Sequence, residues 1–189
     1  QPVKSAGNNR ETNGPPVGET YYRRNASGAW VAGTRPAGIS NNDAYDIMST
    51  VSNAKNILVV GATNPITVYS SAKDVALTTF SSWGPTDDGR IKPDLVTDGV
   101  NVFSPISTAN NAYDIYTGTS MSSPAAAGSL LLLQEYYSRL HGGTFMRSAT
   151  LKGIVIHTAR EAGPNPGPDY QFGWGVLNME DAAAVITAN

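Results

Sequence analysis

One segment of the sequence has the residue types and spacing of a nucleophile, and it reads Thr-Gly-Thr-Ser-Met-Ser-Ser-Pro over residues 117–124. A helix is predicted to begin at Ser120. The amino end of a helix carries roughly +0.5 charge and free backbone N–H groups, which together stabilise an oxyanion. Gly118 leaves room for a substrate backbone to approach. Position alone leaves two alternatives open, a nucleophile at Ser120 or a helix cap, and the cap is the commoner role.

A serine hydroxyl becomes a good nucleophile only when a base removes its proton. The sequence has two histidines, His141 and His157, and both follow Ser120. His141 is predicted at the carboxyl end of the same helix, where a histidine usually offsets the helix dipole. His157 is predicted as an ordinary polar residue of a later helix. We therefore expect neither histidine to act as the base for Ser120.

The elements that must position Ser120 are predicted from apolar runs and turn residues. Ile57–Ala62 is an apolar, β-branched run that predicts a strand buried on both faces. The first 14 residues from Ser120 carry no charge, which predicts a helix enclosed on all sides. Strands followed by helices indicate an α/β layered domain. Further strands are predicted at Val75–Phe80, Asp94–Val96 and Asn101–Phe103, and helices at Ser120 to about Leu140, Thr144–Thr158 and Met179–Ile186.

The first 45 residues are rich in Gly, Pro, Asn and Thr, which predicts a long surface loop or an insertion. Loops of this length are uncommon inside compact domains and often functional. Tyr21, Tyr22 and Trp30 are aromatic residues in this otherwise polar stretch. Two roles are equally compatible with them, lining a substrate cleft or pinning the insertion to the body of the domain.

Composition excludes several classes of protein. The chain has 189 residues, 40% of them apolar, which suits one sizeable domain or a large part of one. Thirteen Lys and Arg against 15 Asp and Glu give a net charge of −2, and this balance argues against nucleic-acid binding. Uninterrupted apolar stretches such as Leu130–Leu133 are far too short to span a membrane. No cysteine is present, so disulfides and thiolate zinc sites are excluded, and the first residues show no secretory signal pattern.

Several motifs together resemble one protein family. Residues 118–124, Gly-Thr-Ser-Met-Ser-Ser-Pro, resemble the nucleophile motif of the subtilisin-like serine proteases, G-T-S-M-[AS]-[ST]-P. Residues 5–8, Ser-Ala-Gly-Asn, resemble the segment that carries the oxyanion asparagine of this family, and residues 170–178 resemble its closing segment. One departure is Ala125, where the family usually has histidine. The resemblance covers the chain apart from about residues 10–46, which look like an insertion.

This resemblance implies a fold and a set of site residues. The fold is α/β, a subtilisin-like doubly wound parallel sheet with helices on both faces, and residues 1–189 form the carboxy-terminal part of its catalytic domain. Ser120 is the implied nucleophile, and Asn8 shares the oxyanion hole with the Ser120 backbone N–H. Without the resemblance, Asn8 is better explained as a turn residue. The implied substrate-binding residues are Ser5, Ala6, Gly7, Gly118 and Thr119.

The resemblance also shows what this chain lacks. In subtilisins the triad follows the order Asp, His, Ser, and neither D-[ST]-G nor H-G-T-H occurs in this sequence. The implied function is a serine endopeptidase for peptide or protein substrates whose Asp and His lie outside this chain. The alternative is a catalytically inactive module that binds peptides or partners. Implied partners are the missing amino-terminal half of the domain or a second copy of the chain, and the implied location is secreted or cell-surface.

No cofactor is needed for this chemistry, although the resemblance makes structural calcium possible. Four aspartates stand near turns and supply the oxygen ligands that calcium prefers. Arg90 and Lys92 lie among them, which favours charge-compensated surface turns, and we expect no metal site here. The four aspartates are Asp87, Asp88, Asp94 and Asp98.

Overall fold

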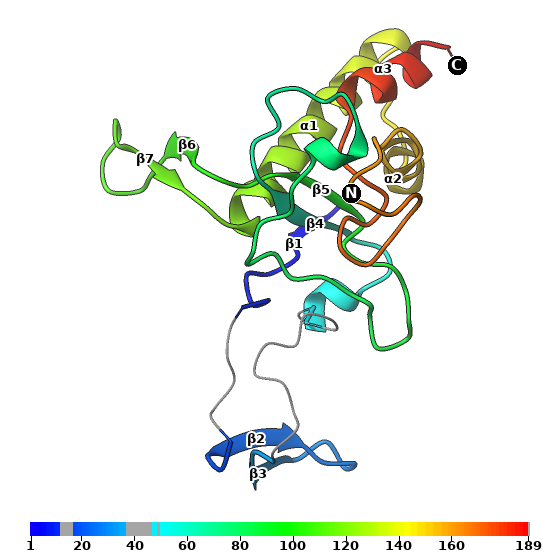
Figure 1. The fold of residues 1–189 in the computed structure, drawn as a ribbon. Helices are drawn as coiled ribbons and strands as arrows, with labels where there is room; N and C mark the ends of the chain where they lie inside the picture. The colour runs from blue at the N-terminus through cyan, green and yellow to red at the C-terminus, as the bar shows by residue number, and fades with distance from the viewer. Residues whose placement is uncertain (12–16, 37–46, 49, 189) are drawn as a thin grey trace.

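A three-stranded parallel sheet lies at the centre of the computed structural model, which describes residues 1–11, 17–36, 47–48 and 50–188 (Figure 1). Its strands are β1 (Val3–Ser5), β4 (Leu58–Thr63) and β5 (Leu95–Asp98), in that order. β4 pairs in parallel with both neighbours. The carboxyl end of β1 therefore lies at the same edge of the sheet as the ends of β4 and β5.

The strand predicted at Ile57–Ala62 is confirmed as β4, shifted by one residue. All six residues of β4 are buried, as the uninterrupted apolar run requires. The strand predicted at Asp94–Val96 is found as β5, which begins one residue later, at Leu95. β1 was not predicted as a strand, because a three-residue segment has too little periodicity to show.

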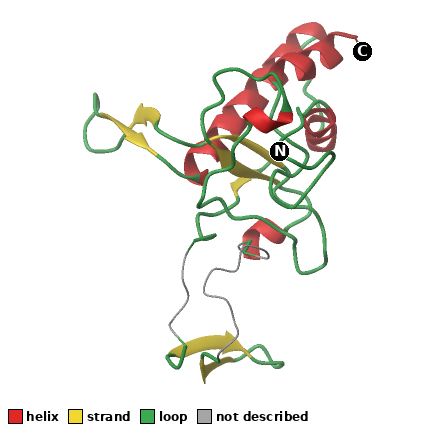
Figure 2. Cartoon of the chain, viewed as in Figure 1, coloured by secondary structure: helices red, strands yellow, loops and turns green. Residues whose placement is uncertain are grey.

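Three α-helices follow the sheet (Figure 2): α1 (Thr119–Leu140), α2 (Ser148–His157) and α3 (Met179–Ala188). Together with the alternating strands they confirm the α/β class. α2 begins later than predicted because Arg147 has an extended backbone, with φ −64° and ψ 148°. α1 packs against all three strands of the sheet. The main core joins sheet and helices through Leu58, Val60, Leu95, Ala126, Leu130, Leu133, Met146, Leu151, Val155, Ala182 and Ile186.

The prediction that α1 is enclosed on all sides is wrong for this chain. Leu131 and Leu132 are 70% and 62% exposed, although Leu130 and Leu133 beside them are buried. The uncharged sequence therefore produces a helix with one apolar face in solvent. No helix among the described residues has both the length and the apolar run that a membrane span requires.

The strand predicted at Val75–Phe80 is not formed. Asp74 accepts backbone N–H groups from Ser70 and Ser71 at 2.8 and 2.7 Å. These bonds cap the short 3-10 helix η2 (Ala72–Asp74) and turn the chain. Beyond it only Leu77 pairs, in an isolated bridge with Thr63. Local capping thus overrides the β-propensity of this segment.

Two antiparallel hairpins lie outside the central sheet (Figure 1). The strand predicted at Asn101–Phe103 is found as β6 (Val102–Pro105), and it pairs with β7 (Tyr113–Tyr116), which was not predicted. The segment predicted as a loop contains β2 (Thr20–Arg24) and β3 (Trp30–Thr34). A second 3-10 helix, η1 (Thr50–Asn53), precedes β4.

A buried carboxylate ties β4, β5 and α2 together. Asp94 Oδ2 accepts the Val59 backbone N–H at 2.7 Å, and it also accepts a hydrogen bond from the Lys92 ammonium. Asp94 Oδ1 lies 2.9 Å from Lys152 Nζ on α2. Burial lowers the pKa of Lys92, and the bond to Asp94 opposes this shift. Asp94 thus holds two lysines and a strand amide at one point.

Candidate active site

The site is built where the chain after β1 meets the first turn of α1. Asn8 Oδ1 accepts the Thr119 backbone N–H at 2.9 Å and the Thr119 hydroxyl at 2.7 Å. Ser120 follows directly and is exposed. The structure therefore brings Asn8 beside the serine motif, although 111 positions separate Asn8 from Thr119.

The segment from Ser5 to Asn8 is fixed on both sides. The Ala6 N–H donates to the carbonyl of Val60 on β4 at 2.9 Å. The Gly7 N–H donates to Thr119 Oγ1 at 3.1 Å, and the Ser82 N–H donates to the carbonyl of Gly7 at 2.8 Å. The Thr119 hydroxyl is thus a bridge that accepts from Gly7 and donates to Asn8.

Gly118 makes the close approach of Asn8 possible. It precedes α1 with φ +154° and ψ 165°, a conformation that is essentially restricted to glycine. A Cβ on Gly118 would lie 2.9 Å from Asn8 Nδ2. A side chain at this position would therefore push the asparagine amide away from the start of α1.

The other residues that the resemblance implied for substrate binding differ in accessibility. Ala6 and Thr119 are buried, at 0% and 1% exposed, so their side chains do not face a substrate. Ser5 and Gly7 are half-buried. The resemblance did not assign the bridging role of the Thr119 hydroxyl, because it concerned substrate contacts and not contacts within the protein.

This arrangement is suited to stabilising a negative oxygen next to a hydroxyl. Asn8 Oδ1 is held by two donors on Thr119, so its Nδ2 group is the donor end of the amide. The first N–H groups of a helix have no intrahelical acceptor, and the Ser120 N–H belongs to this first turn of α1. The Asn8 Nδ2 group, the Ser120 N–H and the Ser120 hydroxyl thus all lie at the amino end of α1.

Neither histidine is placed to activate Ser120. His141 caps the carboxyl end of α1 and stacks on Tyr137 with ring centroids 4.0 Å apart. At 1.5 Å per residue, a helix of this length puts it about 30 Å along the axis from Ser120. His157 ends α2, which packs beside the carboxyl half of α1, where Leu151 and Leu130 line one pocket. The base required by a serine nucleophile is not among these groups.

Three of the four aspartates near turns, Asp88, Asp94 and Asp98, are engaged by protein groups. Hydrogen bonds from the Arg90 and Thr86 side chains lower the pKa of Asp88 to about 2. Asp94 binds two lysines, as described above, and Asp98 Oδ1 accepts the Val100 N–H at 2.9 Å. Over the described ranges no group of three or more acidic or histidine side chains is arranged to hold a metal ion.

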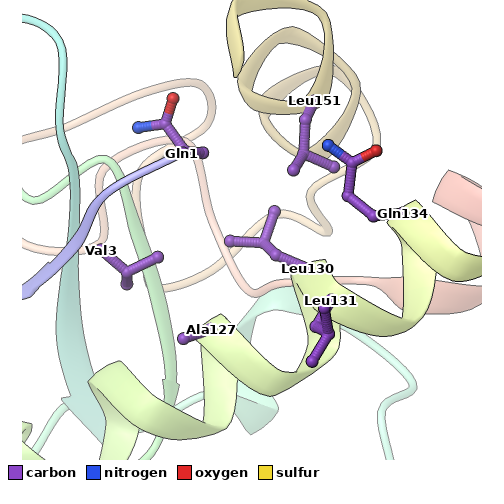
Figure 3. Close-up of a pocket in the computed structure, with 7 residues that line it drawn as sticks. All are labelled: Gln1, Val3, Ala127, Leu130, Leu131, Gln134 and Leu151. Atoms are coloured by element: carbon purple, nitrogen blue, oxygen red, sulfur yellow. The ribbon is translucent and has the colours of Figure 1, made fainter. Parts of the chain in front are cut away.

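A pocket further along α1 is separate from this site (Figure 3). It has a volume of about 170 Å³, below the roughly 300–1,000 Å³ of typical ligand pockets. Figure 3 shows Leu130 and Leu151 facing each other between α1 and α2, with Val3 of β1 at the other side. Its lining starts two turns beyond Ser120, at Ala127, so it does not form part of the Ser120–Asn8 site.

Comparison with known proteins gives a family match over most of the chain. The model of the subtilase family matches residues 2–175. A C5a peptidase of Streptococcus pyogenes serotype M3 is 45% identical over 85 residues, covering 45% of this chain and 7% of the relative. A subtilisin-like protease of Arabidopsis thaliana is 30% identical over 123 residues, covering 56% of this chain and 16% of the relative. The chain thus spans only a small share of these relatives.

Solved structures show the same fold. The CspB protease of Clostridium perfringens superposes with a TM-score of 0.67 and 23% identity over 82% of this chain and 32% of that chain. The self-cleaved protease domain of PatA gives a TM-score of 0.62 and 16% identity over 99% of this chain and 50% of that one. At these identities the likeness concerns the fold alone.

Proposed function

Because the chain belongs to the subtilase family of serine proteases, we propose that it supplies the nucleophile and the oxyanion hole of a serine endopeptidase. Ser120 is the nucleophile, and Asn8 Nδ2 and the Ser120 N–H are the oxyanion donors. The observation that carries the proposal is the pair of hydrogen bonds from Thr119 to Asn8 Oδ1, which orients the amide at the start of α1.

The geometry suits acyl transfer in two steps. Ser120 Oγ attacks the carbonyl carbon of the scissile bond while a base takes its proton, and the carbonyl oxygen becomes an oxyanion. The base then protonates the leaving amine as the C–N bond breaks, and water hydrolyses the acyl-enzyme. Each oxyanion donor contributes about 2.7–4 kcal/mol, a magnitude measured in subtilisin, which belongs to this same family.

We further propose that the base and its orienting aspartate precede Gln1 in a longer polypeptide. The positions of His141 and His157 support this, because neither lies at the amino end of α1. The order Asp, His, Ser of subtilisins places both missing residues before Ser120. The chain by itself is then at most a very weak hydrolase.

The surface on which the missing half packs is proposed to be the outer edge of β1 with the exposed face of α1. Among the described strands β1 pairs with β4 alone, and a free strand edge readily accepts another strand. Leu131 and Leu132 are exposed apolar residues, and Leu131 and Val3 both line the pocket drawn in Figure 3. A second copy of the chain is the alternative occupant of this surface.

The substrate is proposed to be a peptide or protein, cleaved outside the cell or at its surface. The streptococcal relatives are peptidases for C5a by name, and we extend to this chain only the substrate class. The location rests on the family resemblance. The rival function is a catalytically inactive module that binds peptides.

A fluorophosphonate probe separates protease from inactive module. In the full-length protein the probe is expected to label Ser120, and the Ser120→Ala variant is expected to stay unlabelled. The isolated chain, which lacks the base, is expected to label far more slowly. Absence of labelling in the full-length protein would favour the binding module.

Thr119→Val tests the bridging hydroxyl. The variant keeps the backbone bond to Asn8 Oδ1 but loses both hydroxyl bonds, the one to Asn8 Oδ1 and the one from the Gly7 N–H, each worth about 0.5–1.5 kcal/mol. We expect kcat to fall about three- to tenfold with little change in KM, because the oxyanion forms only in the transition state. Steady-state kinetics on one peptide substrate measure this, and Thr119→Ser is expected to restore kcat. An unchanged kcat for Thr119→Val would show that the bridge does not position Asn8.

A further inference from the structure

We propose that residues 17–36, here called the arm, form a secondary binding site for acidic segments of protein substrates. The arm consists of β2, β3 and their connecting turn. This inference rests on the proposed protease function, because it concerns how a substrate is captured for Ser120. It adds a partner surface that the nucleophile and oxyanion residues do not provide.

The arm is tethered beside the oxyanion asparagine. The Arg10 N–H donates to the carbonyl of Phe80 at 3.3 Å, and the Ile47 N–H donates to the carbonyl of Trp83 at 3.3 Å. The Arg10 guanidinium lies 4.3 Å from the Trp83 ring centroid. Both ends of the inserted segment are therefore fixed at residues 80–83, close to the chain that carries Asn8.

This tether limits how far the arm can lie from the site. Seven residue steps join Arg10 to Val17, and an extended chain spans at most about 25 Å over that length. The strands of the arm add about 17 Å. A substrate segment bound at the arm therefore lies within about 42 Å of Arg10, a span of roughly a dozen extended residues.

The turn of the arm is held in one conformation by its own side chains. Asn25 Oδ1 accepts the N–H groups of Ser27 and Ala29 at 3.1 and 2.9 Å. The ring of Tyr21 lies against Gly33, where a Cβ would be 3.2 Å from Tyr21 Cε1. The hairpin is thus ordered by contacts within residues 17–36.

One face of the arm combines two aromatic side chains with the guanidinium of Arg24. The register pairs Tyr22 with Ala32 and Arg24 with Trp30, so these four side chains share a face. Tyr22 and Trp30 are 69% and 65% exposed. Their exposure argues against the alternative that they pin the insertion to the body of the domain.

Arg24 is presented for binding a carboxylate. Its guanidinium lies 4.9 Å from the Trp30 ring centroid, and its Nη1 donates to the carbonyl of Gly28 at 3.0 Å. A guanidinium has five N–H donors, so others stay available for a second partner. Arginine binds carboxylates through two parallel hydrogen bonds, and an arginine already held in place loses less entropy on binding.

Charge identifies the kind of partner. Arg35 of the arm is buried, and the exposed Arg23 and Arg24 against the exposed Glu19 give the surface of the arm a net charge of +1, whereas the whole chain carries −2. A cationic surface on an anionic protein attracts acidic segments selectively. Anionic membranes and nucleic acids carry the same negative charge as acidic protein segments. The tether beside Asn8 nevertheless favours a ligand that also reaches Ser120, namely a protein substrate.

Binding is measured on the full-length Ser120→Ala protein, so that the result does not depend on catalysis. The probe is a fluorescein-labelled octaglutamate peptide, followed by fluorescence anisotropy at low salt. The variants Arg24→Glu and Trp30→Ala are each expected to weaken binding about tenfold or more. Lys73→Glu, an exposed charge change outside the arm, is the matched control and is expected to leave the affinity within about twofold.

Kinetics then connect binding to cleavage. The active protein is given two peptides that differ only in a hexaglutamate or hexaglutamine tract about ten residues from the scissile bond. We expect kcat/KM to be at least about fivefold higher for the glutamate peptide, and the Arg24→Glu variant to abolish this preference. Cleavage of the glutamine peptide is expected to be the same in both proteins.

Three results would overturn the inference. One is octaglutamate affinity that is equal in the wild-type arm and the variants, and another is a glutamate preference that the variants retain. The third is binding of the arm to phosphatidylserine vesicles or to single-stranded DNA without binding to octaglutamate, which would assign it to a membrane or a nucleic acid. If octaglutamate binds through the arm but the fluorophosphonate does not label Ser120, the proposed function fails while the binding site stands.

Discussion

Replacing Ser120 by alanine in the full-length protein is expected to lower kcat by about 10⁶-fold, the size of the effect in subtilisin, a member of the same family. The reason is that the hydroxyl forms the covalent bond to the substrate, so no neighbouring group can replace it. KM is expected to change little, because the oxyanion donors and the substrate surface stay in place. Hydrolysis of a chromogenic peptide under single-turnover conditions measures the loss.

The matched control is Ser123→Ala, which removes a hydroxyl one turn further along α1. We expect its kcat to stay within about threefold of the wild-type value, because a serine outside the site makes no transition-state contact. The Ser120→Ala protein should also unfold at nearly the same temperature as the wild type, since Ser120 is exposed. Residual activity of Ser120→Ala near the wild-type level would exclude Ser120 as the nucleophile.

Replacing Asn8 by alanine is expected to lower kcat by about 10²–10³-fold, or about 2.7–4 kcal/mol. This range was measured for the oxyanion asparagine of subtilisin, a member of the same family. The loss arises because the Nδ2 group donates to an oxygen that becomes negative only in the transition state. KM should change by much less than kcat, since the substrate in its ground state does not need this bond.

Asn8→Asp distinguishes the donor from a merely structural role. The aspartate keeps an oxygen that can accept both Thr119 hydrogen bonds, but it replaces the donor with a second, negatively charged oxygen. We expect kcat to fall at least as far as in Asn8→Ala, with the Thr119 contacts retained. Asn9→Ala is the control, and it should leave kcat within about threefold of wild type. An Asn8→Asp enzyme with substantial activity would contradict the oxyanion role.

The elements that sequence predicts best are those fixed by local pattern. β4 was predicted because the segment Ile57–Ala62 is an apolar, β-branched run, and α1 because it begins with a long uncharged stretch. The prediction of a strand at Val75–Phe80 is wrong because Asp74 accepts hydrogen bonds from Ser70 and Ser71. These contacts lie before the predicted strand and are not visible in its own pattern. β7 and the arm were missed because turn-rich composition conceals short hairpins that are stabilised by pairing.

The candidate site shows the same division between local and distant information. The motif around Ser120 is contiguous, and it was found directly. Asn8 was identified only through the family resemblance, because nothing local distinguishes an oxyanion asparagine from a turn asparagine. The bridging Thr119 hydroxyl required the structure, since it depends on a contact across 111 positions.

The exposed face of α1 connects a wrong prediction to the proposed assembly. Its uncharged sequence predicts full enclosure, yet Leu131 and Leu132 are exposed in this chain. This exposed apolar face is where we propose that a partner packs. Packing of the proposed amino-terminal half against this face would cover both leucines.

The central claim is that the Ser120 hydroxyl and the Asn8 amide act on the same carbonyl group. It is tested most directly by a crystal structure of the full-length protein with a peptide boronic acid bound. We expect boron bonded to Ser120 Oγ, with one boronate oxygen about 2.7–3.1 Å from both Asn8 Nδ2 and the Ser120 nitrogen. Boron bonded to another residue, or a boronate whose oxygens all point away from Asn8, would contradict the account.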